Sequence, residues 1–374
     1  MARTQESLYR DIDLELSWSE RDLPERERTK HVHRLHPYLG KFIPQLVETL
    51  LGRYVAPGSR VLDPFAGSGT TLVQALESGR EPTGVDVAAF NCLLMRVKTA
   101  RYNLVTLERE LRDVCRRLDT FEPDTELQPD APPYVQRWYA PAAAAELLFW
   151  RSLVTDYEHA DVLRVVLTRA ARSARRTPHF DLDFPQTPQL EPYWCHKHRR
   201  TCRPVGTAHQ FLRRYALDTL ARIKAFSRLR SDASADVLHG DVRALVLDGS
   251  FDAVVTSPPY PGLIDYHEQH RYAYELLSLQ ERRSEELGSS ADGSSRLALQ
   301  AYVDGIVAAF DNIVPYLSDG APVLIVVNDR RELYAEILSR SGLALDDRLR
   351  RHVNRRTGRR AGEFFEDILV ARRA

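Results

Sequence analysis

A strand–helix alternation near the N-terminus constrains the fold of this chain more than any other feature. The stretch SRVLDPF (59–65) predicts a short strand, and AGSGTTLVQALESG (66–79) predicts a glycine-rich turn that opens a helix. A second strand, PTGVDV, and a second helix, AAFNCLLMRVKTARYNL, follow directly. Such an alternation predicts a parallel, doubly wound sheet with helices on its faces.

The alternation stops after residue 103 and resumes near residue 234. Between these points helical patterns dominate, in LERELRDVCRRLDTF, APAAAAELLFWRSLV, ADVLRVVLTRAARSA and TAHQFLRRYALDTLARIKAF. Strand patterns return in ADVLHGDVRAL, FDAVVTSPPY, APVLIVVND and FEDILVARR. We therefore predict an N-terminal arm (1–35), the first half of an α/β domain (36–103), a mostly helical insertion (104–233) and the second half of the α/β domain (234–374).

The formal net charge of zero hides two basic blocks. Residues 164–230 contain 15 Lys and Arg against 4 Asp and Glu, and residues 348–373 contain 9 against 3. Clustered cations of this kind indicate a surface for a polyanion, although solvated helix faces are the simpler interpretation. The candidate nucleic-acid contacts are Arg175, Arg176, Lys197, Arg199, Arg200, Arg203, Arg355, Arg356 and Arg359.

Cysteine usage and hydropathy indicate a protein of a reducing cytoplasm. The N-terminal stretch is charged throughout, and the longest strongly apolar run, APVLIVV, is too short to span a bilayer. The chain has four cysteines, too few and too scattered for a disulfide framework. We expect no membrane segment.

The turn DPFAGSGTT predicts a site for a nucleoside-containing cofactor. Gly67 and Gly69 allow close backbone approach and positive φ, and the following helix offers free N–H groups. The turn is neither a P-loop nor a full G-x-G-x-x-G, because Leu72 occupies the third glycine position. Asp86 ends the next strand, where a carboxylate binds ribose hydroxyls. Asp63 suits an ammonium group, which favours S-adenosylmethionine over a dinucleotide; the alternative is that both carboxylates merely cap strand ends.

Four segments, HPYLGKFIP, DPFAGSGTT, GVD and TSPPY, resemble the motif set of the DNA methyltransferases that modify exocyclic amino groups. The Ser-Pro-Pro-Tyr form is similar to the cytosine-N4 branch, whereas the adenine-N6 branch more often has Asp or Asn in place of Ser257. The resemblance covers residues 36–100 and 235–372. It implies a Rossmann-like, S-adenosylmethionine-dependent methyltransferase sheet with an inserted helical target-recognition domain, and double-stranded DNA as partner.

The resemblance also implies a set of cofactor contacts. Lys41 and Phe42 are implied at the methionine end of the cofactor, and a helix entry with a core Phe is the competing interpretation. Asp241 is implied at the adenine, and a strand-end turn Asp explains it equally well. The predicted cofactor-binding residues are Lys41, Phe42, Asp63, Pro64, Phe65, Ala66, Gly67, Ser68, Gly69, Thr70, Asp86 and Asp241.

The segment TSPPY ends a buried strand, because proline cannot donate to a β-ladder. The amino nitrogen of cytosine is a poor nucleophile, since its lone pair is delocalised into the ring. A Ser257 hydroxyl and a rigidly held Pro258 carbonyl that accept its N–H bonds favour its attack on a methyl sulfonium. We predict N4-methylation of cytosine in duplex DNA by base flipping and direct in-line transfer, with Ser257, Pro258, Pro259 and Tyr260 as catalytic residues. Tyr260 offers an aromatic face to the flipped base.

Several alternatives stay open at this point. They are adenine-N6 methylation of DNA, amino methylation of guanine in RNA, and a non-catalytic DNA-binding regulator on a relict methyltransferase fold. Methylation of cytosine at carbon 5 is disfavoured. That reaction uses a cysteine nucleophile, usually after a proline, and no cysteine here follows a proline. No nuclease motif is evident, so a cognate restriction endonuclease is expected as a separate chain.

The segment CHKHRRTC contains ligand types for zinc. Cys195, His198, Cys202 and the later His209 form one candidate set, but the paired C-x-x-C spacing of structural zinc sites is absent. We favour a basic, DNA-facing segment here and expect no metal. For a second candidate set, His179, Asp181 and Asp183, we favour a polar turn.

Overall fold

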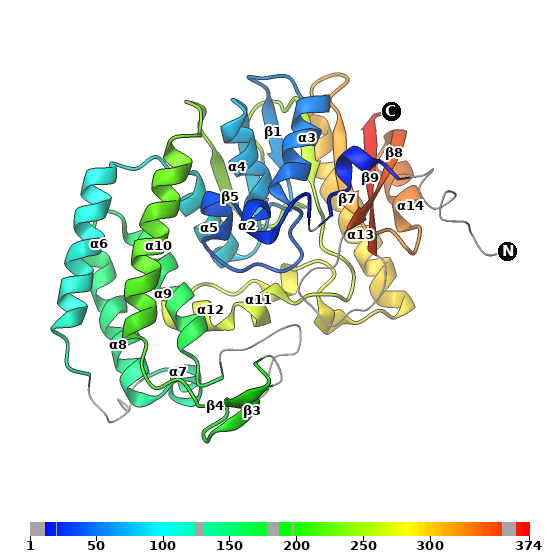
Figure 1. The fold of residues 1–374 in the computed structure, drawn as a ribbon. Coiled ribbons are helices and arrows are strands. Elements are labelled where there is room, and N and C mark those ends of the chain that lie inside the picture. Colours follow the sequence, from blue (N-terminus) through cyan, green and yellow to red (C-terminus); the bar gives the residue numbers. More distant parts are fainter. Residues whose placement is uncertain (1–11, 20, 124–130, 178–186, 196–197, 354–363) are drawn as a thin grey trace.

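The computed structural model describes residues 12–19, 21–123, 131–177, 187–195, 198–353 and 364–374. Its centre is a seven-stranded sheet of order β5-β2-β1-β6-β7-β9-β8, flanked on one side by a block of helices (Figure 1). The strands are β1 (Arg60–Asp63), β2 (Glu81–Asp86), β5 (Asp236–His239), β6 (Ala253–Thr256), β7 (Val323–Val327), β8 (Leu343–Val353) and β9 (Phe364–Arg373). Strands β5, β2, β1, β6 and β7 run parallel, and β9 is antiparallel to β7 and β8. The predicted Rossmann-like α/β fold is confirmed.

Alternating side chains of the central strands face two separate cores. Val61 of β1 packs with Val255 and Val326 on one face of the sheet, whereas its neighbour Leu62 packs with Val254 on the other. This follows from the two-residue period of a strand. The helices beside the sheet are α3 (Pro44–Tyr54), α4 (Thr70–Glu77), α5 (Ala89–Thr99), α13 (Arg296–Ile313) and α14 (Leu333–Arg340).

The helical block is built from the segment between β2 and β5. Its elements are α6 (Leu104–Asp119), α7 (Pro133–Trp138), α8 (Pro141–Leu153), η3 (Val154–Asp156), α9 (Ala160–Ala174), the hairpin β3 (Tyr193–Cys195) and β4 (Arg200–Cys202), and α10 (His209–Ser227). Asn103 caps α6, because its side chain accepts hydrogen bonds from the backbone N–H groups of Val105 and Thr106. Trp150 and Leu163 of this block share one hydrophobic core with Phe90 of α5. The helices therefore pack directly on the α/β part, and the domain boundaries given above remain a prediction.

Short elements complete the described chain. They are η1 (Leu14–Leu16), α2 (Glu25–Arg28), η2 (His31–Arg34), α11 (Tyr266–Gln269), α12 (Arg271–Leu277), η4 (Arg283–Glu285), η5 (Ser290–Asp292) and η6 (Val314–Tyr316).

Helix α13 is the element that comes nearest to a membrane span by length and composition. The apolar stretch Arg296–Tyr316 passes that test among the described residues. However, Ile306, Phe310 and Ile313 of α13 are buried in the core between this helix and the sheet. Packing against the sheet accounts for the hydropathy of this helix.

Candidate active site

The carboxyl ends of the parallel strands meet around one cavity. Strand β1 ends at Asp63, β2 at Asp86, β5 at His239 and β6 at Thr256, so these ends share one edge of the sheet. Ligands of open α/β sheets bind at this edge, beside the point where the strand order reverses. The cavity encloses about 810 Å³, counted to its open mouth. Its walls include Lys41, Phe42, Pro64, Phe65, Ala66, Gly67, Ser68, Thr70, Asp86, Asp241, Ser257 and Pro259.

The glycine-rich turn forms the floor of the cavity, and its backbone requires glycine. Gly67 has φ +51° and Gly69 has φ +78°, and a Cβ atom at Gly69 would stand 2.9 Å from Met95 Cγ. Gly67 N donates to Asp86 Oδ2 at 2.8 Å. The turn is thereby tied to the end of β2, as the spacing of these motifs predicts.

Asp86 is held in place by backbone and side-chain donors. Its Oδ1 accepts hydrogen bonds from Ala88 N at 2.8 Å and from Asn91 Nδ2 at 3.1 Å. Burial raises the pKa of Asp86 to about 7, and the charge of Glu286 acts in the same direction. A fixed carboxylate on the wall is suited to accept hydroxyl groups of a ligand.

Asp63 has a different position from the one predicted. It is buried, does not line the cavity, and accepts a hydrogen bond on Oδ1 from Thr256 Oγ1 at 2.7 Å and another from Phe65 N at 3.2 Å. Burial raises the pKa of Asp63 to about 6. These bonds join the end of β1 to the end of β6, so Asp63 braces the site from behind instead of meeting an ammonium group. Gly69 likewise lies outside the cavity wall.

Two lysines stand beside the glycine-rich turn. Lys41 lines the cavity, and its Nζ donates to the carbonyl oxygen of His33 at 2.8 Å. Burial lowers the pKa of Lys41 to about 8. Lys98, 1% exposed, donates to the carbonyl oxygen of Ser68. The sequence analysis missed Lys98, because a lysine inside a helical pattern is normally solvated.

The Ser-Pro-Pro-Tyr segment follows β6 at the mouth of the cavity. Ser257 Oγ donates to the carbonyl oxygen of Val326 at 2.9 Å. Ser257 and Pro259 line the cavity, and Pro258 between them is buried. Tyr260 is half-buried and outside the cavity wall, with its Oη 3.4 Å from Glu366 Oε1. The segment is therefore anchored to both β7 and β9.

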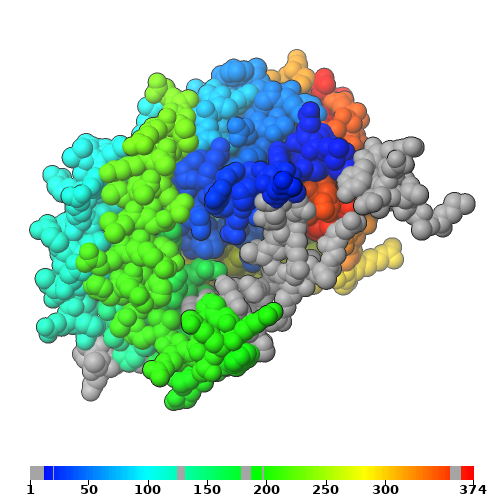
Figure 2. Space-filling view, in the orientation of Figure 1, coloured from blue at the N-terminus to red at the C-terminus, as the bar shows by residue number. Residues whose placement is uncertain are grey.

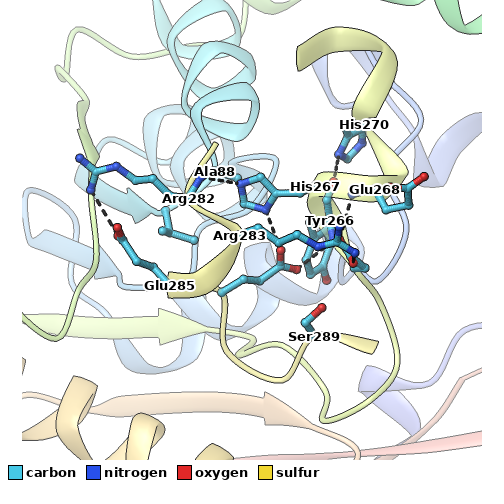
Figure 3. Close-up of polar contacts among 12 residues, drawn as sticks. Ala88, Tyr266, His267, Glu268, His270, Arg282, Arg283, Glu285 and Ser289 are labelled. Carbon is cyan, nitrogen blue, oxygen red and sulfur yellow. Dashed lines mark hydrogen bonds and ion pairs between the residues drawn. The ribbon is translucent and has the colours of Figure 1, made fainter. Parts of the chain in front are cut away.

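A cap segment, residues 261–295, closes one side of the cavity. Its residues Tyr266, Glu285, Glu286 and Leu287 line the wall. In Figure 3, Tyr266 and His267 lie beside the stretch that runs from Arg282 to Ser289. His267 joins the two parts, because its Nδ1 is 2.7 Å from Glu286 Oε2 and its Nε2 accepts from Arg282 N at 3.3 Å.

The N-terminal segment HPYLGKFIP meets the cap segment across the cavity. Tyr38 stacks on Tyr266 with ring centroids 5.4 Å apart, and its hydroxyl accepts a hydrogen bond from Asn91 Nδ2 at 3.1 Å. The sequence analysis included this segment but did not single out Tyr38 or Asn91. Glu286 carries no local sequence signal, since only the tertiary fold brings it to this wall.

Asp241 lines the cavity after β5 and is paired with a neighbour. Arg243 Nε donates to Asp241 Oδ1 at 2.9 Å, and Arg243 Nη2 donates to Oδ2 at 2.6 Å. Although burial opposes ionisation, these hydrogen bonds hold the pKa of Asp241 below its usual value. An ionised carboxylate therefore stands at this end of the cavity.

The predicted nucleic-acid contacts differ in accessibility. Arg199, Arg200 and Arg203 are exposed on and beside β4, and Arg176 is half-buried with its Nε 3.2 Å from the carbonyl oxygen of Tyr139. The prediction of Arg175 as a nucleic-acid contact is wrong. This arginine is 2% exposed, and its guanidinium lies over the ring of Tyr272 at 5.0 Å. Burial removes it from any phosphate at the surface. Lys197, Arg355, Arg356, Arg359, His179, Asp181 and Asp183 lie outside the described residues.

Three of the four candidate zinc ligands come together. One ligand atom each from Cys195, His198 and Cys202 lie within 4.8 Å of one another. The inclusion of His209 in the candidate zinc set is corrected. His209 lies at the start of α10, where its Nε2 pairs with Asp119 Oδ1 at 2.9 Å.

Comparison with known proteins gives matches of several kinds. A family model described as DNA methylase matches residues 3–95. The Type II methyltransferase M.MjaII of Methanocaldococcus jannaschii is 35% identical over 92% of this chain and 81% of its own length. The Type II methyltransferase M.MvaI of Kocuria varians is 24% identical over 61% of this chain and 53% of its own length. Among solved structures, TrmN from Thermus thermophilus covers 90% of this chain and 50% of that chain, with 14% identity and a TM-score of 0.33.

Proposed function

The chain belongs to the N6/N4 DNA methylase family, and from that premise we propose that it transfers a methyl group from S-adenosylmethionine to the N4 amino group of cytosine in duplex DNA. Membership of the family establishes an S-adenosylmethionine-dependent DNA methyltransferase. The base, the residues that act on it and the mode of DNA binding are the proposed parts.

A serine at position 257, as in the resembling cytosine-N4 enzymes, supports the choice of cytosine, and the state of its hydroxyl supports a role as acceptor for an exocyclic amino group. Because Ser257 Oγ donates its hydrogen to the carbonyl oxygen of Val326 at 2.9 Å, only its lone pairs remain for a ligand. A neutral oxygen that can only accept matches an amino group whose N–H bonds must be held. In the resembling adenine-N6 enzymes this position more often carries Asp or Asn.

The cavity fits S-adenosylmethionine on two grounds. Asp86 offers a fixed carboxylate for ribose hydroxyls, and Lys41 offers a cation for a carboxylate. Ser68 Oγ and Asn91 Oδ1 are buried on the wall and have no hydrogen-bond partner among the described residues. Buried polar atoms of this kind require a partner, which a polar ligand supplies.

When bound, S-adenosylmethionine supplies an electrophilic methyl group on a sulfonium centre. The chain's own contribution is to position the acceptor nitrogen and stabilise the positive charge that develops on it. Ser257 Oγ accepts one N–H bond of the target amino group. The Pro258 carbonyl accepts the other, and its rigidity follows from the fixed φ angles of two consecutive prolines. Neither residue needs to act as a strong base, because the proton can leave after transfer.

Access to the amino group requires a flipped base. Tyr260, anchored through Glu366, provides the aromatic surface on which the base stacks. Exposed arginines of the β3–β4 hairpin contribute phosphate contacts, with the helical block as the target-recognition region. A cognate restriction endonuclease, where one exists, is a separate chain.

The product nucleoside tests this proposal. The full chain is incubated with unmodified plasmid DNA and isotopically labelled S-adenosylmethionine, and the DNA is digested to nucleosides for mass spectrometry. We expect label in N4-methylcytosine. Label in N6-methyladenine would retain the family and overturn the choice of base.

RNA and a mock reaction without enzyme serve as controls. Label in methylguanosine of RNA would favour the RNA alternative. Cofactor binding with no label on either nucleic acid would favour the regulator.

A further inference from the structure

A cluster of ligand-type side chains lies in the β3–β4 hairpin, which stands apart from the central sheet (Figure 1). The Sγ atoms of Cys195 and Cys202 and a ring nitrogen of His198 lie within 4.8 Å of one another. We propose that these three side chains bind a zinc ion that holds the hairpin together. This inference goes beyond methyl transfer and does not depend on which base is methylated.

The spacing of the ligand atoms agrees with zinc coordination. Zinc–sulfur and zinc–nitrogen bonds of about 2.3 Å and 2.0–2.1 Å in a tetrahedron place a sulfur and a nitrogen ligand about 3.6 Å apart. His198 Nδ1 is 3.4 Å from Cys202 Sγ. Two thiolates and an imidazole favour zinc over magnesium or calcium, which prefer oxygen ligands. The fourth position belongs to a water molecule or to another side chain.

The strand register brings the two cysteines to one face. Cys195 is paired with Arg200, and Cys202 is paired with Tyr193, so the cysteines are diagonal neighbours on the same side of the hairpin. Arg199, between His198 and β4, has φ +51°, a left-handed conformation that is uncommon for residues other than glycine. The chain therefore reverses direction sharply within the ligand set.

Among the described residues, the hairpin has no hydrophobic core of its own that would hold this geometry. Each strand has three residues, and within the described part of the chain the two strands pair only with each other. Cys195 is 4% exposed, yet it belongs to none of the hydrophobic clusters among the described residues. Trp194 is 57% exposed. Because an isolated two-stranded hairpin is marginally stable, a bound metal supplies the missing link between its strands.

The charge of the surroundings also suits a zinc–thiolate centre. Arg199, Arg200 and Arg203 are exposed close to the ligands. Two thiolates balance the charge of the ion, so the hairpin keeps its basic surface. Figure 2 shows the hairpin, in green, projecting from the lower edge of the molecule.

Metal content of the full chain is the direct test. The protein is prepared without a histidine tag and dialysed against metal-free buffer, and zinc is measured by plasma mass spectrometry. We expect about one zinc per chain, lost in Cys202→Ser and in His198→Ala. Cys115→Ser is the matched control, because Cys115 lies in α6 outside the cluster and should leave the zinc content unchanged.

Replacement by Co²⁺ gives a second readout. We expect the visible bands of tetrahedral cobalt together with a thiolate-to-cobalt charge-transfer band, both lost in Cys202→Ser. S-adenosylhomocysteine binding at the remote cavity verifies that each variant is folded.

Two results would overturn the inference. One is zinc no higher than the buffer blank in the unaltered chain, both as purified and after incubation with zinc and dialysis. The other is a chain without bound metal in which peptide mapping finds a disulfide between Cys195 and Cys202.

Discussion

The cavity contains an acid and a base whose pKa values are displaced toward each other. Burial raises the pKa of Asp86 to about 7, with a further contribution from the charge of Glu286. Burial lowers the pKa of Lys41 to about 8. In the free protein both groups are therefore mostly charged only in a narrow interval near pH 7.5. A ligand that binds the carboxylate and the ammonium form should bind best in that interval.

We accordingly expect a bell-shaped pH dependence of cofactor affinity. Below pH 7 Asp86 must lose a proton before it binds, and above pH 8 Lys41 must gain one, so affinity falls on both sides. For S-adenosylhomocysteine, calorimetry should give an affinity about five- to tenfold lower at pH 6 than at pH 7.5. Asp86→Asn should abolish the acid limb and Lys41→Met the alkaline limb. An acid limb that persists in Asp86→Asn would assign it to another group.

At the scale of elements, a buried ion pair ties β8 to β9 behind Tyr260. Arg351 is 1% exposed, and its Nε and Nη2 donate to Glu366 Oε2 at 2.8 Å and 2.6 Å. The same carboxylate contacts Tyr260 through its other oxygen. Loss of the cation would leave a buried, unpaired carboxylate between these two strands.

Arg351→Met should therefore lower the free energy of unfolding by about 3–5 kcal/mol. Arg348→Met is the matched control on the same strand, because the Arg348 side chain is 46% exposed and pairs with Asp367 at 2.8 Å. Because the Arg348 side of this pair stays in contact with solvent, we expect its loss to cost only about 0–1 kcal/mol. Urea unfolding followed by circular dichroism measures both variants. Equal losses would show that burial of the Arg351–Glu366 pair has no special energetic weight.

The elements that could be predicted from sequence are those with a strong local pattern. Strands β6 and β7 are short apolar runs, β1 and β2 are marked by the alternation with helices α4 and α5, and α6 and α9 have clear helical periodicity. Strand β8 was missed, because its middle is charged and exposed and a bulge at Leu345/Asp347 interrupts its pairing. The β3–β4 hairpin was missed, because three-residue strands leave no recognisable period.

Among the residues of the cavity, too, those in a sequence motif could be predicted and those brought there by tertiary packing could not. The glycine-rich turn, Asp86 and Ser257 carry motifs, and Asp86, Ser257 and all of the turn residues 66–70 except Gly69 line the wall. Glu286 and Lys98 reach the site only through tertiary packing, in segments that have no motif. Asp63 was assigned to the ligand, whereas its burial and its bond from Thr256 make it a brace.

At the scale of the whole molecule, the carboxyl ends of the parallel strands bring the cavity and the Ser-Pro-Pro-Tyr segment together. The ends of β1, β2 and β5 surround the cavity, and the end of β6 brings Ser257 to the same wall. The helical block stands to one side of the sheet (Figure 1). In the proposed mode of binding, this block and its basic hairpin grip the duplex while the target base enters the cavity. The proposed methyl transfer depends most on Ser257 as an acceptor for the target amino group.

The most direct test is the single-turnover rate of methyl transfer by Ser257→Ala, with product analysis. Loss of one preorganised hydrogen-bonding group at the reacting centre should lower this rate by about 10²-fold. The dissociation constant for S-adenosylhomocysteine should remain within about twofold of the unaltered chain, because Ser257 contacts the target base in this account. Full-rate formation of N4-methylcytosine by Ser257→Ala would contradict the account.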